Sequence, residues 1–356
     1  MKILHIVEDF SISSGGLRTV IQNLDFQLKK RGHQSYILSS NKEKEDAIFV
    51  VKSKKKWLYS NKWTEKIDEI VTKYHINKIH IHGVWLYPQY IGAKYAIQNK
   101  IPMILSPHGM YQPWLWRKGM LKKKLYFNLL SKKWFSKASI IHSITSNETT
   151  NLKKLFPQNY FVEIPNLISL QENNTHYNAK EKYILYIGRL NKTKGIDLLI
   201  KAFSEIKNKN VTLKIAGEFN EYKKELVTIV KSLSLGDKIE FLGIVKNKIK
   251  INLIKNAWVL VSPTYSDVIG MANLEGASFK TPVITTYNTG LKKKWNSNGG
   301  RLINPNLREL KEVLSQIIGW SLEDRNRNGK ELFTFVKQNY SWEKCISDWE
   351  NLYINS

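Results

Sequence analysis

The sequence predicts an α/β protein with two halves, each built on a doubly wound, parallel sheet of the Rossmann type, and a central cleft between them. Three observations favour this fold class. Short β-rich runs alternate with apolar residues at helical spacing, and this alternation occurs twice along the chain. A polar stretch without apolar periodicity, residues 166–182, separates the two series and predicts a linker. The length of 356 residues exceeds that of most single cores.

The first half, residues 1–165, begins with KILHIV (2–7), which predicts a strand. A helix should follow it, because apolar residues then recur at helical spacing, namely Leu17, Val20, Ile21, Leu24 and Leu28. Further β-rich runs predict the strands 35–38, 47–51, 78–82, 102–105, 139–144 and 160–164.

The second half, residues 183–340, repeats this arrangement, with a strand at YILYI (183–187) and then a helix. That helix carries Ile196, Leu199, Ile200 and Phe203 on one face. Strands are predicted at 211–217, 238–243, 258–262 and 281–286, with helices near 221–233, before 258 and after Gly270.

The charge balance is the unusual property of the composition. Lys and Arg number 56 against 30 Asp and Glu, which gives a net charge of +26, while the hydrophobic content of 42% is ordinary. Such a field attracts nucleic acid, an anionic membrane face or phosphorylated substrates. The lone Cys345 excludes an internal disulfide and a structural cysteine–zinc site.

The apolar runs are short. The N-terminal run is too short for a signal peptide, and no run approaches the roughly 20 residues that a membrane span needs. We therefore expect a cytoplasmic protein.

Several loops have compositions that suit a ligand. The pair Gly15 and Gly16 stands between a predicted strand and helix, where backbone can approach an anion, although a plain tight turn would have the same residues. This is not a GxGxxG fingerprint, which counts against a dinucleotide-dependent oxidoreductase.

His82 in HIHGVW (80–85) and His108 in SPHGMYQPW (106–114) follow predicted strands, where ligands of open α/β sheets bind. A structural histidine is the alternative, above all at His82.

The stretch YIGRLNKTKG (186–195) combines a strand end, Gly188, two cations and the start of a helix. Arg189 offers a bidentate fork and Lys194 a point charge, so together they would suit a diphosphate.

In SPTYSDVIGMANLEGASFKTPVI (262–284), Asp267 and Glu275 lie eight positions apart. Within one helix they would be about 12 Å apart, too far to act on one bond. With Asp267 in a loop, both could line one elongated ligand; a surface acid and a helix-facing acid are the alternative.

The segment 114–137 is basic, amphipathic and free of acids. It carries Trp, Leu and Phe residues together with Arg117, Lys118, Lys122, Lys123, Lys124, Lys132, Lys133 and Lys137. This pattern is typical of a helix on an anionic membrane surface, and a solvated helix with one core face is the alternative. Nucleic acid is a weaker interpretation, because no RNP, KH or helix-turn-helix signature is present.

Four stretches, in order and spacing, resemble family 4 of the glycosyltransferases, the retaining, nucleotide-sugar-dependent enzymes of the GT-B fold. They are SPHGMYQPW, GRLNKTKG, IAG (215–217) and SDVIGMANLEGASFKTPVI (266–284). The resemblance implies a UDP- or GDP-sugar donor, a glycan or lipid-linked acceptor, no metal and no other cofactor. It also implies that the last helix, 341–356, crosses back to the first domain.

The resemblance assigns roles residue by residue. Arg189 and Lys194 match the pair that neutralises the leaving diphosphate. Glu275 matches the residue that holds the ribose, and His108 matches a histidine that contacts the donor sugar. The remaining donor-binding residues are Gly15, Gly16, Gly188, Gly270, Met271, Ala272 and Asn273. His82 and Trp85 are the candidates for acceptor binding.

Asp267 departs from the pattern, since the family has Glu there, followed by Gly-Phe-Gly or Asn-Phe-Gly, and this chain has Val268 and Ile269. The leading hypothesis is a retaining glycosyltransferase of surface-polysaccharide synthesis, peripheral to the inner membrane face. A nucleotide-sugar epimerase or hydrolase, or a non-catalytic membrane-bound scaffold, remains an alternative.

Overall fold

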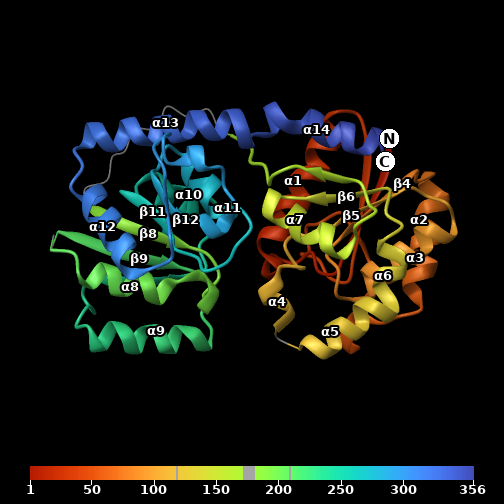
Figure 1. Ribbon diagram of the computed structural model, residues 1–356, viewed down its shortest axis with the longest axis horizontal. Helices are drawn as coiled ribbons and strands as arrows, with labels where there is room; N and C mark the ends of the chain where they lie inside the picture. Colours follow the sequence, from red (N-terminus) through yellow and green to blue (C-terminus); the bar gives the residue numbers. More distant parts are fainter. Residues whose placement is uncertain (118, 171–180, 208–209) are drawn as a thin grey trace. The chain divides into compact units, whose positions relative to one another are not determined.

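The computed structural model describes residues 1–117, 119–170, 181–207 and 210–356, without the side chains of residues 13 and 117. The chain divides into two compact units (Figure 1). Unit 1 comprises Met1–Asn166 and Cys345–Ser356, and unit 2 comprises Leu167–Lys344. Of the predicted linker 166–182, residues 171–180 lie outside the described residues.

Unit 1 contains a parallel sheet of seven strands in the order β3-β2-β1-β4-β5-β6-β7. The strands are β1 (Lys2–Val7), β2 (Gln34–Ser39), β3 (Phe49–Val50), β4 (Lys78–His82), β5 (Met103–Ser106), β6 (Ile140–Ser143) and β7 (Phe161–Glu163). The main helices are α1 (Gly16–Lys30), α2 (Lys62–Tyr74), α3 (Tyr87–Gln98) and α7 (Ser146–Leu155). The chain builds outward from β1 to β3 and then returns to place β4 on the other side of β1. The switch point of the sheet therefore lies between β1 and β4.

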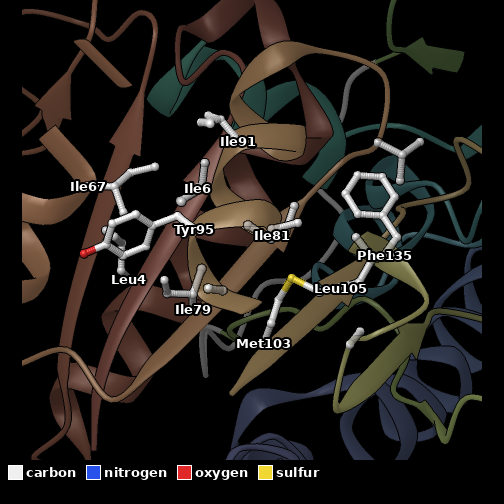
Figure 2. Packing of buried hydrophobic residues seen from close by; sticks show 14 of the residues in the cluster. Leu4, Ile6, Ile67, Ile79, Ile81, Ile91, Tyr95, Met103, Leu105 and Phe135 are labelled. Carbon is white, nitrogen blue, oxygen red and sulfur yellow. The ribbon is translucent and has the colours of Figure 1, made fainter. Parts of the chain in front are cut away.

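The core of unit 1 forms where alternate residues of the central strands meet the helices. Figure 2 shows Leu4 and Ile6 of β1 and Ile79 and Ile81 of β4 packed near side chains of the covering helices. Those helical side chains include Ile67, Ile91, Tyr95 and Phe135. Central parallel strands are covered on both faces, which is why apolar runs in the sequence located them correctly.

Unit 2 contains a second parallel sheet, of six strands in the order β10-β9-β8-β11-β12-β13. The strands are β8 (Lys182–Ile187), β9 (Val211–Ala216), β10 (Ile239–Gly243), β11 (Val259–Ser262), β12 (Val283–Thr286) and β13 (Arg301–Ile303). The helices are α8 (Ile196–Ser204), α9 (Glu221–Ser232), α10 (Asn247–Lys255), α11 (Met271–Ser278), α12 (Leu307–Ile318) and α13 (Leu322–Tyr340). Its switch point lies between β8 and β11. The sequence did not predict β13, which is only three residues long.

The basic segment 114–137 is not one continuous helix. It consists of α4 (Pro113–Arg117), α5 (Met120–Tyr126), a π-helical turn (Phe127–Ser131) and α6 (Lys132–Phe135). The first break falls before α5, where Gly119 adopts a left-handed conformation with φ +71°. Glycine adopts this conformation without steric cost, so the direction of the chain can change there.

The helix α14 (Trp342–Ile354) follows α13 and returns the chain to unit 1. Trp349 and Tyr353 of α14 are buried against unit 1, with ring centroids of His142 and Trp349 only 4.5 Å apart. Among the described residues, no helix has the length and apolar character needed to cross a membrane.

Candidate active site

The candidate donor site of unit 2 lies at the carboxyl ends of β8 and β11, on the two sides of the switch point. The loops after these strands are joined, because Tyr265 N and Thr264 Oγ1 donate to Thr193 O at 2.8 and 2.9 Å. Gly195, with φ +67°, starts α8 so close to the β11 loop that a Cβ there would overlap with the Pro263 carbonyl. The two loops thus form one packed unit.

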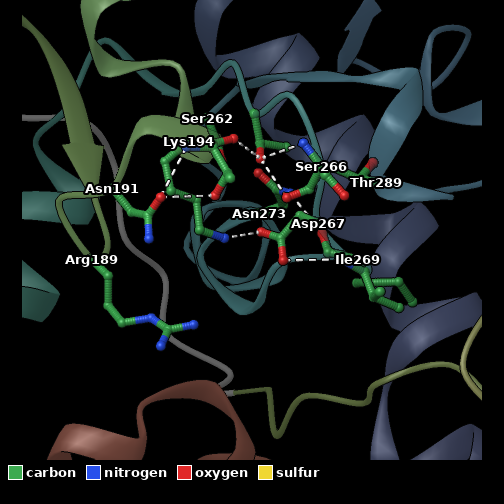
Figure 3. A network of polar contacts seen from close by, with 12 residues as sticks. Arg189, Asn191, Lys194, Ser262, Ser266, Asp267, Ile269, Asn273 and Thr289 are labelled. Carbon is green, nitrogen blue, oxygen red and sulfur yellow. Dashed lines mark hydrogen bonds and ion pairs between the residues drawn. The ribbon is translucent and has the colours of Figure 1, made fainter. Parts of the chain in front are cut away.

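Two of the predicted site residues meet directly in this unit. Lys194 Nζ lies 2.5 Å from Asp267 Oδ2, and Figure 3 shows this ion pair within the surrounding polar network. Both side chains retain about a fifth of their exposure, so the pair is partly desolvated and remains accessible to a ligand. The second oxygen, Asp267 Oδ1, accepts a hydrogen bond from Val268 N at 3.0 Å. Asp267 therefore orients the ammonium group of Lys194.

Arg189 follows β8, and Figure 3 shows its side chain apart from the hydrogen-bonded network of Lys194 and Asp267. Its side chain is exposed, and within the described part of the chain its guanidinium makes no hydrogen bond or ion pair. Its backbone is held firmly, since the buried Tyr186 donates its hydroxyl to Arg189 O at 2.9 Å. The preceding Gly188 adopts φ +157° and lies over the Tyr186 hydroxyl. An anchored arginine without a partner is well suited to bind an anion.

The turn from Asp267 to Gly270 is strained. Ile269 has φ +61°, which is unusual for a β-branched residue, and Gly270 follows with φ +70°. The turn is fixed by Ile269 N donating to Thr289 O at 2.7 Å and by Asn273 Nδ2 donating to Ile269 O at 2.7 Å. Such strain costs about 1–3 kcal/mol and gathers at functional sites.

This turn leads into α11, and Met271 and Ala272 form its first turn. The first backbone N–H groups of a helix have no partner within the helix, and they favour an anion. Glu275 lies further along α11, where its Oε1 is 2.6 Å from Lys250 Nζ of α10. The sequence did not predict this ion pair, because 25 positions separate its members.

In unit 1, Gly15 and Gly16 form the start of α1. Gly15 caps the helix with φ +66°, and a Cβ there would meet no atom within 4 Å. The glycine is therefore required by its backbone conformation rather than by crowding.

His108 follows β5 and is held in a left-handed conformation, φ +52°. Its Nε2 is 2.9 Å from His82 Nδ1, and His82 Nε2 is 2.9 Å from His5 Nδ1. Burial lowers the pKa of His108 to about 3 and that of His82 well below its usual value, so both rings are neutral at neutral pH. Direct acceptor binding by His82 does not fit this arrangement. The ring is fully buried and both nitrogens are bonded to histidines, so His82 positions His108 instead.

A second hydrogen-bond chain crosses the same buried face of the sheet. His142 Nε2 must donate to Ile164 O (2.8 Å), because a carbonyl only accepts, and its Nδ1 then accepts from Ser106 Oγ (2.8 Å). Ser106 in turn accepts from His80 Nε2 (2.6 Å), which leaves His80 Nδ1 to accept from the Tyr353 hydroxyl (2.7 Å). The chain is satisfied throughout only while both histidines are neutral.

His5, His80 and His82 have ring nitrogens within 4.8 Å of one another, which is the spacing of a potential metal site. Most of these nitrogens already serve the hydrogen bonds described above, and His5 Nε2 is buried without a partner. The geometry is that of a neutral hydrogen-bonded cluster. Independence from metal and other cofactors stays a prediction.

Trp85, the other candidate for acceptor binding, lies in an aromatic cluster beneath the basic segment. Its Nε1 donates to Met110 O at 3.2 Å, and its ring lies 5.1 Å from that of Tyr111 and 5.2 Å from that of Trp116. Lys123 Nζ lies 5.2 Å from the centre of the indole ring. The ring is half-buried, so packing uses much of its surface.

Two parallel Rossmann-like sheets, with cations and a helix start at the switch point of the second, define a glycosyltransferase of the GT-B fold. The family model for Glycosyltransferase Family 4 matches residues 14–172, and that for Glycosyl transferases group 1 matches residues 169–331. The two models together cover most of the chain, which therefore belongs to the group 1 glycosyltransferases of the family 4 type and is a transferase enzyme.

Known proteins support this assignment. An uncharacterised glycosyltransferase of Methanocaldococcus jannaschii is 29% identical over 283 residues, 77% of this chain and 74% of that one. The structure of Anabaena HepE in complex with UDP and glucose has a TM-score of 0.77, 14% identity and full coverage of both chains. WaaG, a glycosyltransferase involved in lipopolysaccharide biosynthesis, has a TM-score of 0.70 and 14% identity over 97% of this chain and 98% of that one.

Sequence reasoning missed three features of these sites. Lys250 was one lysine among many, and the conformation of Ile269 leaves no mark in the sequence. Sequence reasoning assigned no role to Glu8, although it is the first polar residue after β1. Its position at the carboxyl end of a predicted parallel strand was the signal that could have identified it.

Proposed function

We propose that the protein transfers a sugar, with retention of configuration, from a nucleoside-diphosphate sugar to a hydroxyl of a glycan acceptor. The observation that carries this proposal is the group of cations at the β8/β11 switch point. Arg189 is anchored and unpaired among the described residues, Lys194 is held by Asp267, and the start of α11 faces the same loops. The complex of HepE with UDP and glucose supports a UDP-sugar as one candidate donor.

The chemistry required of this site is electrostatic. Negative charge builds up on the diphosphate as the bond from the sugar to phosphate breaks, and preorganised cations stabilise it. In the resting site Lys194 is shared with Asp267, so a bound diphosphate would take up part of its hydrogen-bonding capacity. Asp267 then has an oxygen available for a sugar hydroxyl, and Glu275 would hold the ribose. The leaving phosphate is the proposed base.

The matched test compares two exposed arginines of unit 2. Arg189→Ala should reduce turnover by on the order of 10²-fold or more, because an electrostatic stabiliser of the transition state is lost. Arg308→Ala should be neutral, since Arg308 forms a surface pair with Glu312 in α12 at 3.0 Å. Thermal shift with UDP, GDP and their sugars identifies the donor, because a ligand of the native state raises the melting temperature. Near-normal activity of Arg189→Ala would contradict the assignment.

A nucleotide-sugar hydrolase or epimerase would share the donor site but need no acceptor. The products formed with and without a glycan acceptor separate these activities. Transfer that depends on the acceptor is expected.

The acceptor is proposed to be lipid-linked, at the inner face of the cell membrane, in surface-polysaccharide synthesis. The role of WaaG in lipopolysaccharide biosynthesis supports this pathway class. The stronger support is a stripe of exposed leucines on α5 and the following turn. Leu121, Leu125 and Leu129 lie four residues apart and are 80%, 61% and 67% exposed. Exposed Lys122, Lys124, Lys132 and Lys133 accompany them, as in helices that lie on anionic membranes.

Vesicle binding tests this surface. The protein should bind phosphatidylcholine vesicles that contain phosphatidylglycerol, and salt should weaken the binding. Replacing all three leucines by serine should weaken it at least about tenfold, because several apolar side chains no longer enter the interface. Ile249→Ser with Leu322→Ser is the matched control, since both are exposed apolar residues of unit 2. Equal binding by all variants would refute the membrane proposal.

A further inference from the structure

The sheet of unit 1 has its own switch point, and an acid occupies it. Glu8 directly follows β1, and Gly83 directly follows the neighbouring strand β4. In open α/β sheets ligands bind at the carboxyl ends of the strands where the chain reverses its order. Glu8 therefore stands in unit 1 where Arg189 and Lys194 stand in unit 2, at the position of a ligand-binding group.

The structure around Glu8 is built to hold its carboxyl group. Gln89 is fully buried at the start of α3, and its Nε2 donates both to Glu8 Oε2 and to His82 O. Its Oε1 accepts from Leu86 N at 3.2 Å, which fixes the amide. Gly83 has φ +85°, and a Cβ there would lie 2.7 Å from Glu8 Oε2. Any other residue at position 83 would crowd the carboxylate.

This arrangement is costly for a structural acid. Within the described part of the chain Glu8 pairs with no cation, although the sequence holds 56 Lys and Arg. Burial raises the pKa of Glu8 to about 7, and the neighbouring Asp9 adds to the effect. The contrast is Glu148, whose two oxygens accept from Gly109 N (2.6 Å) and Ile144 N (2.8 Å). Glu148 organises its loops and is 2% exposed, whereas Glu8 stays partly exposed at the sheet edge.

We propose that Glu8 binds a sugar hydroxyl of the acceptor and thereby determines which glycan is used. The inference rests on the proposed transferase function. The ionised carboxylate accepts a hydrogen bond from the hydroxyl, and Gln89 and Gly83 position it. His108, two strands away along the same sheet edge, does not titrate near neutrality, so it does not provide the pH dependence expected of Glu8.

The direction of that pH dependence follows. Glu8 is protonated below its pKa and ionised above it, so the KM for the acceptor should fall as pH rises through about 7. The groups that face Glu8 are Gln89, whose amide does not titrate, and Asp9. Asp9 accepts hydrogen bonds from Ser11 N and Oγ.

The test uses Glu8→Gln, which keeps shape and the bond from Gln89 but removes the ionisation. Hexyl glycosides of glucose, galactose, mannose and N-acetylglucosamine serve as acceptors, with the nucleotide sugar that gives the largest thermal shift as donor. For Glu8→Gln, we expect a KM for the glycoside at least tenfold higher, a KM for the donor within twofold of wild type, and no inflection near pH 7. The melting temperature at pH 8 should not fall, because the variant lacks a charge that partial burial disfavours.

An unchanged glycoside KM with an unchanged pH profile would overturn the proposal. So would a lower melting temperature with a uniform loss of all kinetic parameters, which is the signature of a structural role. If no glycoside is a substrate, its binding is measured by saturation-transfer NMR, and equal binding by wild type and variant overturns the proposal. Calorimetry with UDP on Arg189→Ala tests the donor site separately, so failure of the transferase function is recognised independently.

Discussion

Acidification should destabilise unit 1 through its buried histidines. His5, His80, His82 and His142 are at most 2% exposed, and burial lowers the pKa of each, to about 4 for His5 and His142. The unfolded chain binds protons at the ordinary pKa of about 6.5. Because the folded pKa values are lowered, the stabilisation is fully present above about pH 6.5 and is lost as pH falls towards 4.

The size of the loss follows from proton linkage. At pH 5 an unfolded histidine is protonated while a buried one stays neutral, which costs about 2 kcal/mol for each histidine relative to pH 7. Four histidines give about 8 kcal/mol, and the lowered pKa of the partly exposed His108 adds to this loss. Glu8, with its pKa raised to about 7, opposes this by about 2 kcal/mol, and the raised pKa of Glu148 acts in the same direction. A net loss of about 6 kcal/mol is comparable with the stability of a whole domain.

Hydrogen exchange of peptides from β4 and β5, measured by mass spectrometry, reports the stability of unit 1 separately from that of unit 2. Protection, corrected for the intrinsic pH dependence of exchange, should fall steeply between pH 7 and 5. His142→Asn should make protection less dependent on pH, by the contribution of about one histidine. His75→Asn, at an exposed helix end, should leave this pH dependence unchanged. A flat profile, or ¹⁵N NMR showing His5 and His142 titrating near pH 6.5 in the folded protein, would refute the reasoning.

Three further outcomes are expected. Gly195→Ala should weaken UDP or GDP binding at least about tenfold in calorimetry, while the circular dichroism spectrum stays native. The reason is that the positive φ and the nearby Pro263 carbonyl oxygen exclude a Cβ at this position. Retained affinity would contradict the role of this loop. Lys250→Ala should weaken nucleotide binding several-fold, since the carboxylate of Glu275 is left uncompensated beside the site; equal or tighter binding would exclude a supporting role. Tyr353→Phe should cost about 1–2 kcal/mol in unit 1 only, because a buried histidine loses its donor; equal exchange protection of β4 in both proteins would argue against that hydrogen bond.

The fold was predictable from the sequence where burial is symmetrical. KILHIV and YILYI are nearly continuous apolar runs because their strands are covered on both faces, and the observed β1 and β8 match them closely. β13 was missed because only Leu302 and Ile303 are apolar there, whereas the equally short β3 and β7 lie within longer β-rich runs. The basic segment was mistaken for one helix, since its charge pattern continues across Gly119 while its backbone does not.

The candidate site was predictable as a set of residue types and not as a set of contacts. Arg189, Lys194 and Asp267 were identified from their neighbours in sequence. The ion pair between Lys194 and Asp267 depends on strand order, which places β8 beside β11 although 73 positions separate the two residues. His82 shows the opposite case. Its place at a strand end suggested a ligand, but the alternation of KIHIH turns His80 and His82 to one face, which α14 covers.

The path of α14 has a consequence for synthesis of the chain. Unit 1 is completed by residues 345–356, which the ribosome releases only after all of unit 2 has been made. Until then the histidine face lacks Trp349 and Tyr353, and His80 Nδ1 lacks its hydroxyl partner. Domains commonly fold one after another from the N-terminus during translation. Here the first domain to emerge is the last to be completed. A chain stalled before α14 would expose the side chains of His80 and His142 to water.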